Sequence, residues 1–390
     1  MKLELLYKRE SFREIFNDAV GQFFAFYYKL DIEISWSKSR FTSSQKVFCV
    51  NSKLNVIYPY NLNKNILYNL CKEYAYNKNV LRRALQFIYV YAFTKTFLRK
   101  LVVEKVQFSE YLSVFDNLVF LPGNNVIRVL DYNSNTSFVI NKLKTNHEFF
   151  NKGNQIRNDL NIRSAPKIIL LSKNFMQEEL ISGTPINRIA NKDLIDSVLN
   201  SVHKELNVIY SNSLELFTIN TYEILINSKT SVLKDKSSLL KNTINVLFKS
   251  LKSQIGSNSL IPISYTHGDF QKANILVTQQ RYLIIDWEFV DKRFLYYDFF
   301  TELFGTRSSN NYFDNIRKWR EIKSNNFSFS NWANDGMNFS IDQNANIYVI
   351  IFLIEELLFR ASEITLTNSK NNQVFDMLVS DINKNQFYEK

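Results

Sequence analysis

The chain has 390 residues, 45% of them hydrophobic, and a formal net charge of +11 from 48 Lys and Arg against 37 Asp and Glu. This balance excludes a globally disordered chain, and the 8 Gly and 5 Pro exclude a collagen-like repeat. Because the sequence contains only two cysteines, it is no disulfide scaffold, and we expect a protein of a reducing compartment.

Residues 1–112 are predicted to form an N-terminal α/β extension domain. Met1–Phe16 alternates charged and apolar residues without the apolar core of a signal peptide, so we expect a soluble, cytoplasmic protein. Asn65–Lys105 has helical periodicity and carries the basic residues Arg82, Arg83, Lys95, Arg99, Lys100 and Lys105. Two interpretations are open: a solvated face of a packed helix, or a surface for peripheral contact with an anionic membrane or polysaccharide.

Strand patterns separated by turn residues follow from residue 117 onward. Three strands are predicted first, then a helix over about His147–Leu160, then two further strands. The predicted strands are Asn117–Leu121, Val126–Tyr132, Ser137–Leu143, Lys167–Leu171 and Phe175–Leu180. Gly183-Thr184-Pro185 closes this unit, which we place at residues 113–183.

Residues 184–390 are predicted to be mainly helical. Helices are expected from residue 187 to about 255, and Tyr348–Phe359 reads as a strongly apolar helix. A strand-like segment, Ile261–Thr266, leads into His267-Gly268-Asp269, and a hairpin of Ile275–Thr278 and Arg281–Asp286 follows.

The spacing of three polar residues around this hairpin points to phosphoryl transfer. Asp269 stands in a loop, Asn274 follows five residues later, and Asp286 ends a strand twelve residues further on. One carboxylate can orient or deprotonate a hydroxyl, while an amide oxygen and a second carboxylate can bind Mg²⁺, which prefers hard oxygen ligands. None of the eight glycines builds a P-loop or a dinucleotide-binding fingerprint.

These residues resemble the aminoglycoside phosphotransferase and choline kinase superfamily. Its pattern is His-Gly-Asp, four variable residues, Asn, and an apolar strand ending in Ile-Asp-Trp/Phe-Glu, and every fixed position is present from His267 to Glu288. Tyr297-Asp298 matches a further Tyr-Asp pair of the family. The resemblance implies a two-lobed, protein-kinase-like α+β fold with a five-stranded N-lobe and a helical C-lobe.

The resemblance also implies roles for single residues. Asp269 is expected to be the catalytic base or hydroxyl-positioning acid, and Asn274 and Asp286 the Mg²⁺ ligands. Glu288 is expected near the metal or the acceptor, with a surface charge as the alternative. His267 is expected to organise the catalytic loop, and Asp298 to tie a helix start to it.

For ATP, the resemblance points to the predicted N-lobe. Lys142 stands where the family has its nucleotide lysine, with Lys144 as the alternative, and the turn at Gly123 is expected to cover the phosphates. Main-chain groups around Glu179 to Ile181 are expected to bind adenine. The family usually pairs its lysine with a Glu of the next helix, but no Glu stands at the expected distance from Lys142.

We therefore predict an ATP- and Mg²⁺-dependent phosphotransferase, a kinase that phosphorylates a hydroxyl of a small molecule or sugar. Choline-like, aminoglycoside-like and cell-surface glycan acceptors are all open. The missing helix Glu favours an alternative, a catalytically inactive kinase-like scaffold that binds a nucleotide or glycan. A nucleic-acid partner rests on net charge alone and is not expected.

Overall fold

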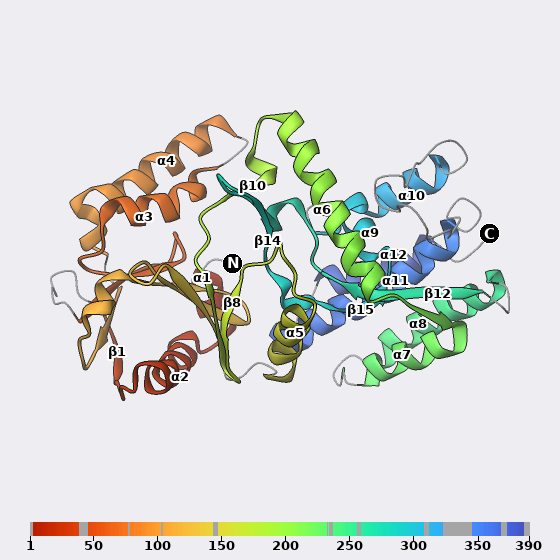
Figure 1. Cartoon of the computed structure of the whole chain (residues 1–390), viewed down its shortest axis with the longest axis horizontal. Helices are drawn as coiled ribbons and strands as arrows, with labels where there is room; N and C mark the ends of the chain where they lie inside the picture. Colours follow the sequence, from red (N-terminus) through yellow and green to blue (C-terminus); the bar gives the residue numbers. More distant parts are fainter. Residues whose placement is uncertain are drawn as a thin grey trace. The chain divides into compact units, whose positions relative to one another are not determined.

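The computed structural model describes residues 3–38, 46–76, 79–102, 104–142, 147–231, 233, 237–255, 259–307, 312–322, 345–367 and 373–385 (Figure 1). The chain divides into two compact units. Unit 1 comprises residues 1–150 and 167–181, and unit 2 comprises residues 151–166 and 182–390. Both helices and strands are abundant, so the fold is α+β.

Within its described residues, unit 1 is built on a nine-stranded sheet in which every neighbouring pair is antiparallel. The strand order is β1-β4-β2-β3-β5-β6-β7-β9-β8. The strands are β1 (Ile34–Lys38), β2 (Val47–Asn51), β3 (Val56–Pro59), β4 (Glu104–Phe108), β5 (Leu118–Pro122), β6 (Val126–Asp131), β7 (Thr136–Asn141), β8 (Ile168–Leu171) and β9 (Phe175–Glu179).

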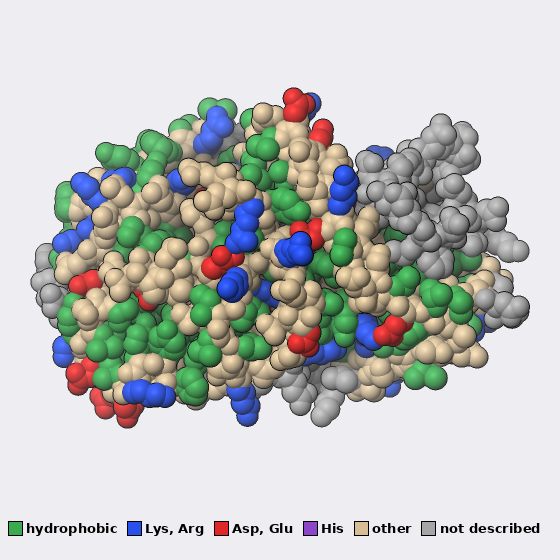
Figure 2. Space-filling view, viewed as in Figure 1, with side chains coloured by type: hydrophobic (Ala, Val, Ile, Leu, Met, Phe, Trp, Pro, Cys, Tyr) green, Lys and Arg blue, Asp and Glu red, His purple; other side chains and the backbone are tan. Residues whose placement is uncertain are grey.

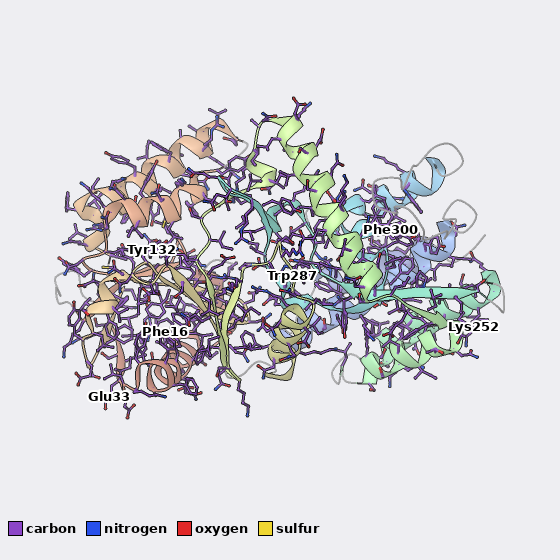
Figure 3. The ribbon with its side chains drawn as sticks, in the orientation of Figure 1. Phe16, Glu33, Tyr132, Lys252, Trp287 and Phe300 are labelled. Carbon is purple, nitrogen blue, oxygen red and sulfur yellow. The ribbon has the colours of Figure 1, made fainter. Side chains whose placement is uncertain are left out.

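Helices cover both faces of this sheet, because successive side chains of a strand point to opposite sides. Phe48 and Val50 of β2 join a core with α2 (Phe12–Phe23), whereas Cys49 joins a core with α3 (Lys64–Cys71) and α4 (Val80–Lys95). The α2 side is rich in aromatic rings, and Phe16 lies in it 5.4 Å from Phe120 of β5 (Figure 3). A short helix, α1 (Leu3–Arg9), precedes α2.

The strands and the helix predicted between residues 117 and 180 are present near their predicted bounds, with α5 at His147–Asp159. They do not form a separate five-stranded sheet, however, because β3 pairs with β5 through Ile57 and Phe120. The sheet and its α2-side core therefore run across residue 112, where the sequence predicted a domain boundary. The compact units thus differ from the predicted division at that position.

Unit 2 is mainly helical, as predicted. Its helices are α6 (Lys192–Asn212), α7 (Ile219–Ser231), α8 (Ser237–Gln254), α9 (Tyr297–Phe304), α10 (Tyr312–Ile322), α11 (Ala345–Thr367) and α12 (Gln373–Asn385). Helix α11 is buried from Ile347 to Ala361, which explains why most of its residues there are apolar.

Two small antiparallel sheets position the loops of unit 2. One has the order β10-β13-β14 and contains the predicted hairpin, as β13 (Ile275–Val277) and β14 (Tyr282–Ile284), beside β10 (Thr184–Pro185). The other has the order β11-β12-β15, with β11 (Glu215–Thr218), β12 (Leu260–Thr266) and β15 (Asp291–Phe294). The sequence predicted β12 but neither β11 nor β15.

Among the described helices, none is long and apolar enough to cross a membrane.

Candidate active site

The His-Gly-Asp motif lies where β12 ends and the β13–β14 hairpin begins. The Ile285 N–H donates to the Asn274 carbonyl oxygen over 2.9 Å, so the hairpin brings Asn274 next to the strand end that carries Asp286. Gly268 has a φ of +86°, and a Cβ at this position would lie 2.5 Å from the carbonyl oxygen of Phe289. Only glycine therefore fits this turn without displacing the backbone.

Asp298 at the start of α9 fastens the loop. Its buried carboxylate accepts hydrogen bonds from the backbone N–H groups of His267, over 2.6 Å, and Gly268, over 2.9 Å. It also accepts one from the hydroxyl of Tyr210 over 2.8 Å. The carboxylate thus holds two consecutive main-chain donors immediately before Asp269.

His267 joins the loop to the hairpin. Its Nε2 lies 2.8 Å from the carbonyl oxygen of Ile285, and its Nδ1 lies 3.3 Å from the backbone nitrogen of Asp269. Because a carbonyl can only accept and an N–H can only donate, these bonds need a neutral ring protonated on Nε2. The ring also packs against Trp287 with centroids 4.6 Å apart, beside the hairpin (Figure 3). Both ring nitrogens are engaged in the loop, which suits an organising residue better than a proton carrier.

The Asp269 carboxylate is held on both oxygens. Oδ1 accepts from Nε of Arg307 over 3.0 Å. Oδ2 accepts from the side-chain amides of Gln271 and Asn274, each over 3.2 Å, and Asn274 also bonds the Asp269 carbonyl over 2.9 Å. The side chain is still 21% exposed. A carboxylate fixed in this way can meet a hydroxyl in one orientation, which is the requirement of a positioning base.

Arg307 is the residue of this site that the sequence did not reveal. Its guanidinium is buried and bridges Asp269 to Glu356 of α11, whose oxygens lie 2.6 and 3.1 Å from Nη1 and Nη2. Burial by itself lowers the pKa of Arg307, but Glu356, Tyr297 and Asp269 outweigh it and hold the pKa well above its ordinary value. Arg307 is therefore a permanent cation behind the Asp269 carboxylate.

Glu356 anchors that cation in the core. Burial raises the pKa of its carboxyl, yet the charges of Arg307 and Arg360 outweigh this effect and leave the pKa below its ordinary value. The Tyr297 hydroxyl donates to the same carboxylate over 2.7 Å. A sequence signal for this cluster exists, because Glu355 and Glu356 interrupt the apolar run of α11, and buried charges need partners.

The two predicted metal ligands have suitable donor atoms. The amide nitrogen of Asn274 is turned toward Asp269, which leaves its oxygen as a ligand. Asp286 is exposed and adopts a left-handed backbone with φ of 63°, directly after the hairpin. Glu288 is half-buried two residues later, and its carbonyl oxygen lies 3.1 Å from where a Cβ on Gly153 of α5 would be. Oxygen donors of this kind fit Mg²⁺.

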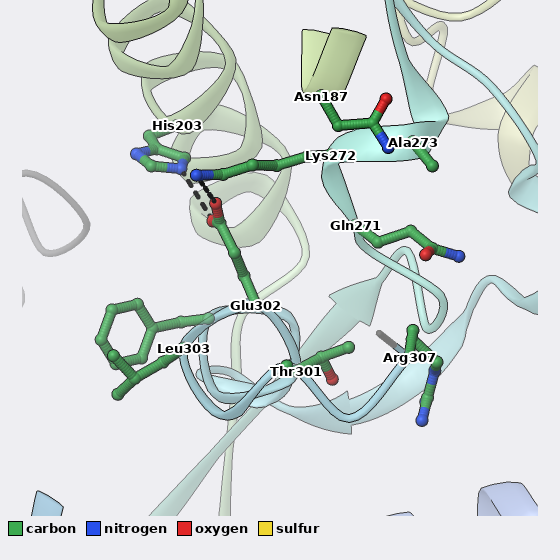
Figure 4. A pocket seen from close by; sticks show the side chains of 11 residues that line it. Asn187, His203, Gln271, Lys272, Ala273, Thr301, Glu302, Leu303 and Arg307 are labelled. Atoms are coloured by element: carbon green, nitrogen blue, oxygen red, sulfur yellow. Dashed lines mark hydrogen bonds and ion pairs between the residues drawn. The ribbon is translucent and has the colours of Figure 1, made fainter. Parts of the chain in front are cut away.

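A cavity of about 540 Å³ opens beside this site within unit 2 (Figure 4). It is lined by Asn187, His203, Gln271, Lys272, Ala273, Phe299, Thr301, Glu302, Leu303, Gly305 and Arg307. Glu302 of α9 lies 3.3 Å from Nε2 of His203 and 3.9 Å from Nζ of Lys272. Gln271 and Arg307 both contact Asp269 and line the cavity, so the cavity adjoins the carboxylate.

The residues predicted to bind the nucleotide lie in unit 1. At Gly123 the N–H donates to the Val126 carbonyl over 2.9 Å, and a Cβ would lie 2.9 Å from that oxygen, so the tight turn requires glycine. Glu179 ends β9, where its N–H donates to the Lys167 carbonyl and its carboxylate accepts the Lys167 N–H. Ile181 follows that strand end and is half-buried. No contact among these residues tests their predicted role.

Lys142 is buried, with 1% of its side chain exposed, and its Nζ lies 2.5 Å from Oε1 of Glu10. It also lies 5.5 Å from the ring centroid of Phe12 in α2. Strand alternation explains this, because Phe138 and Ile140 face α2 while Val139 faces Phe150 of α5. The lysine thus has a glutamate partner in the N-terminal segment, whereas the family usually supplies one from the next helix. The alternative, Lys144, lies outside the described residues.

Part of the chain that contains this site matches a known protein family. Residues 233–323 match the model of the phosphotransferase enzyme family. The resemblance predicted from the sequence is therefore confirmed over this segment. The matched segment contains residues 267–288, which include the His-Gly-Asp loop and the hairpin. It also contains Asp298 and Arg307. No match to a curated protein sequence was found.

Solved structures of kinases of this kind resemble the chain only distantly. An ethanolamine kinase of Plasmodium vivax is 15% identical, with a TM-score of 0.43 over 83% of this chain and 94% of that one. A choline kinase of Streptococcus pneumoniae is 13% identical, with a TM-score of 0.41 over 71% and 91%. An aminoglycoside phosphotransferase in complex with streptomycin and ATP is 11% identical, with a TM-score of 0.43 over 70% and 93%. Likeness at this level carries no argument about function.

Proposed function

We propose that this protein is a kinase-like phosphotransferase that transfers the γ-phosphoryl group of ATP to a hydroxyl of a small molecule or sugar. One observation carries the proposal: Asp269, Asn274 and Asp286 are gathered by a single loop and hairpin, inside the segment that matches the phosphotransferase family. The catalytic carboxylate and both metal ligands then belong to one rigid piece of unit 2.

Each residue has a distinct task in this proposal. Asp269 orients the acceptor hydroxyl and accepts its proton as the phosphoryl group arrives. Asn274 and Asp286 would hold Mg²⁺, which when bound neutralises charge on the phosphates. Glu288 supplies a further carboxylate near the metal ligands, and His267 keeps the loop in shape. Gly123, Lys142, Glu179 and Ile181 stay the predicted ATP-binding residues, although the burial of Lys142 does not favour phosphate contact.

The cavity beside Asp269 suits an acceptor that is rich in hydroxyls. Its charged walls are nearly balanced, because Glu302 is close to Lys272 and His203, and Arg307 is paired with Asp269. Phe299 is the only Phe, Tyr or Trp among the described lining residues, whereas quaternary ammonium ions are bound by several such rings together. A neutral polyol or sugar is therefore favoured over a choline-like or polycationic acceptor.

One observation favours the alternative, an inactive kinase-like scaffold that binds a nucleotide or glycan. Lys142 is buried, and it forms an ion pair with Glu10 of the N-terminal segment. A scaffold would keep ligand binding and lack turnover, so the two functions differ in one measurement.

The proposal is tested by ATP turnover against a panel of neutral sugars, polyols, choline and an aminoglycoside. Asp269→Asn is expected to reduce turnover by about 10²–10⁴-fold, because it removes the proton acceptor but keeps the shape of the side chain. Thermal stabilisation by Mg²⁺-ATP should persist in this variant. In Asp286→Asn, the additional stabilisation that Mg²⁺ gives to ATP binding should be lost.

Asp193→Asn, an exposed aspartate near the start of α6, is the matched control and should behave as the wild type. Undiminished turnover in a folded Asp269→Asn variant would refute the assigned base. Mg²⁺-ATP binding without turnover of any acceptor would favour the scaffold.

A further inference from the structure

Helix α4 of unit 1 exposes an apolar face. The exposed fractions are 71% for Leu81, 59% for Leu85 and 62% for Ile88, and 68% for Val80, 50% for Phe87 and 51% for Tyr91. At 100° per residue these positions form one continuous stripe along the helix. Only Val90 and Thr94 of this helix are buried against the rest of unit 1. We call the six exposed residues the α4 stripe.

The charged residues of α4 and of the segments that flank it in the sequence have a single sign. From Tyr74 to Val103 the sequence contains no Asp or Glu and six Lys or Arg. Arg82 and Arg83 are exposed at the beginning of α4. Figure 2 shows hydrophobic and basic side chains mixed over this part of unit 1.

The structure also shows which basic residues of the segment have other tasks. Lys105 is completely buried, where its Nζ contacts Sγ of Cys49 and donates to the Lys100 carbonyl. Arg99 donates to the carbonyl of Leu62, and Lys100 lies over the ring of Tyr60. The predicted basic surface is thus smaller than the sequence suggested and is centred on Arg82 and Arg83. The apolar stripe is exposed, whereas the interpretation of this segment as a packed helix predicted that its apolar face is buried.

We propose that the α4 stripe binds to the surface of an anionic lipid bilayer. An amphipathic helix that combines a continuous apolar face with basic residues and no acids matches the interfacial region of a bilayer, where side chains enter the acyl boundary and cations meet lipid phosphates. A free phosphate or an acidic polymer would satisfy the cations but would leave the six apolar side chains in water.

A second copy of the chain fits the stripe less well. A symmetric pairing of two α4 helices would join two segments whose charges are all basic, and no acid of this segment could neutralise them. The charge pattern therefore favours a partner that is anionic over its whole surface.

The proposal is tested by sedimentation with vesicles of phosphatidylcholine alone and of phosphatidylcholine with phosphatidylserine. The wild type is expected to bind the anionic vesicles at low salt and to be released as salt rises. Leu85→Ser together with Ile88→Ser should weaken binding at least roughly tenfold, because two apolar side chains no longer enter the bilayer. Arg82→Gln together with Arg83→Gln should weaken it by roughly tenfold or more, since each basic residue near an acidic bilayer contributes about a fivefold gain.

Ile224→Ser is the matched control, because Ile224 of α7 is 70% exposed outside the stripe. It should bind vesicles like the wild type, and all variants should unfold at the same urea concentration, since exposed positions carry little stability. The proposal would be overturned if the wild type did not bind anionic vesicles at low salt. It would also be overturned if the protein bound dextran sulfate equally well and the serine substitutions had no effect on binding. A wild-type dimer that the serine substitutions dissociate would overturn it as well. ATP turnover is measured separately, so failure here leaves the phosphotransferase proposal intact.

Discussion

The ion pairs of Lys142 and Arg307, two of the buried cations in the described residues, differ in what surrounds them. Lys142 in unit 1 is 1% exposed, pairs with Glu10 and lies near the ring of Phe12. Arg307 in unit 2 is 6% exposed, but it pairs with Asp269, which is 21% exposed, and it lines the cavity beside that carboxylate. The sequence drew attention to the first cation because of its strand position, and it gave no reason to single out the second.

The difference shows that a motif position does not by itself decide what a charged side chain contacts. Lys142 and Arg307 both neutralise a carboxylate, but only Arg307 joins its carboxylate to a cavity of the same unit. Lys142 fastens residue 10 to the sheet over a separation of 132 residues. We infer that Arg307 positions a catalytic group, and that the Lys142–Glu10 pair stabilises the N-terminal segment on the sheet.

Arg307→Met is expected to have the largest effect, because it should lower both stability and turnover. A change in the Lys142–Glu10 pair should lower stability alone. Arg307→Met leaves Glu356 buried with Arg360 beside it and removes the side chain that holds Oδ1 of Asp269. Breaking a buried ion pair costs about 3–5 kcal/mol of unfolding free energy, and misplacing Asp269 should lower turnover by about 10²-fold. Urea denaturation and initial rates measure the two effects.

Arg307→Lys serves as the conservative variant and should restore more stability than turnover, because a single ammonium cannot reproduce the planar fork between Asp269 and Glu356. If Arg307→Met retained normal kcat and KM for the acceptor while losing stability, Arg307 would be merely structural.

A smaller effect is expected for Glu10→Gln. The variant removes the carboxylate from the Lys142–Glu10 ion pair, which should cost about 1.5–3 kcal/mol of unfolding free energy, as for hydrogen bonds to charged groups. The thermal stabilisation by Mg²⁺-ATP should not change if the pair is structural. Glu14→Gln, an exposed glutamate of α2, is the matched control. Loss of the Mg²⁺-ATP effect in Glu10→Gln would show instead that Lys142 binds the nucleotide with Glu10 as its partner.

The smallest effect is expected when the pH is lowered. The pKa of Glu356 is lower in the folded protein than its ordinary value of about 4.3. Its contribution to stability is therefore complete above that value and is lost as the pH falls through the folded pKa. Glu356→Gln should be less stable than the wild type at pH 7, and the gap should narrow by on the order of 1 kcal/mol toward pH 3. Urea midpoints between pH 7 and pH 3 measure the gap, and a constant difference would contradict the ionised cluster.

The local geometry of the candidate site could be predicted from the sequence. His267 to Glu288 lie within 22 consecutive positions, so a loop and a short hairpin suffice to gather Asp269, Asn274 and Asp286. The strands between residues 117 and 180 were predictable for the same reason, because alternation and turn residues are local signals.

Contacts between distant segments could be decided only by the tertiary structure. The pairing of β3 with β5, the bond of Lys142 to Glu10 and the bridge from Asp269 through Arg307 to Glu356 join residues that are far apart in the sequence. The exposure of the α4 stripe is of the same kind, because apolar periodicity shows that a helix has an apolar face but not whether anything covers it. The sequence by itself therefore determined the loop and hairpin of the candidate site and the type of most elements. Which charged groups meet, and which apolar face stays open, depends on how the chain packs, and the physical cause is that burial and pairing are properties of neighbours in space.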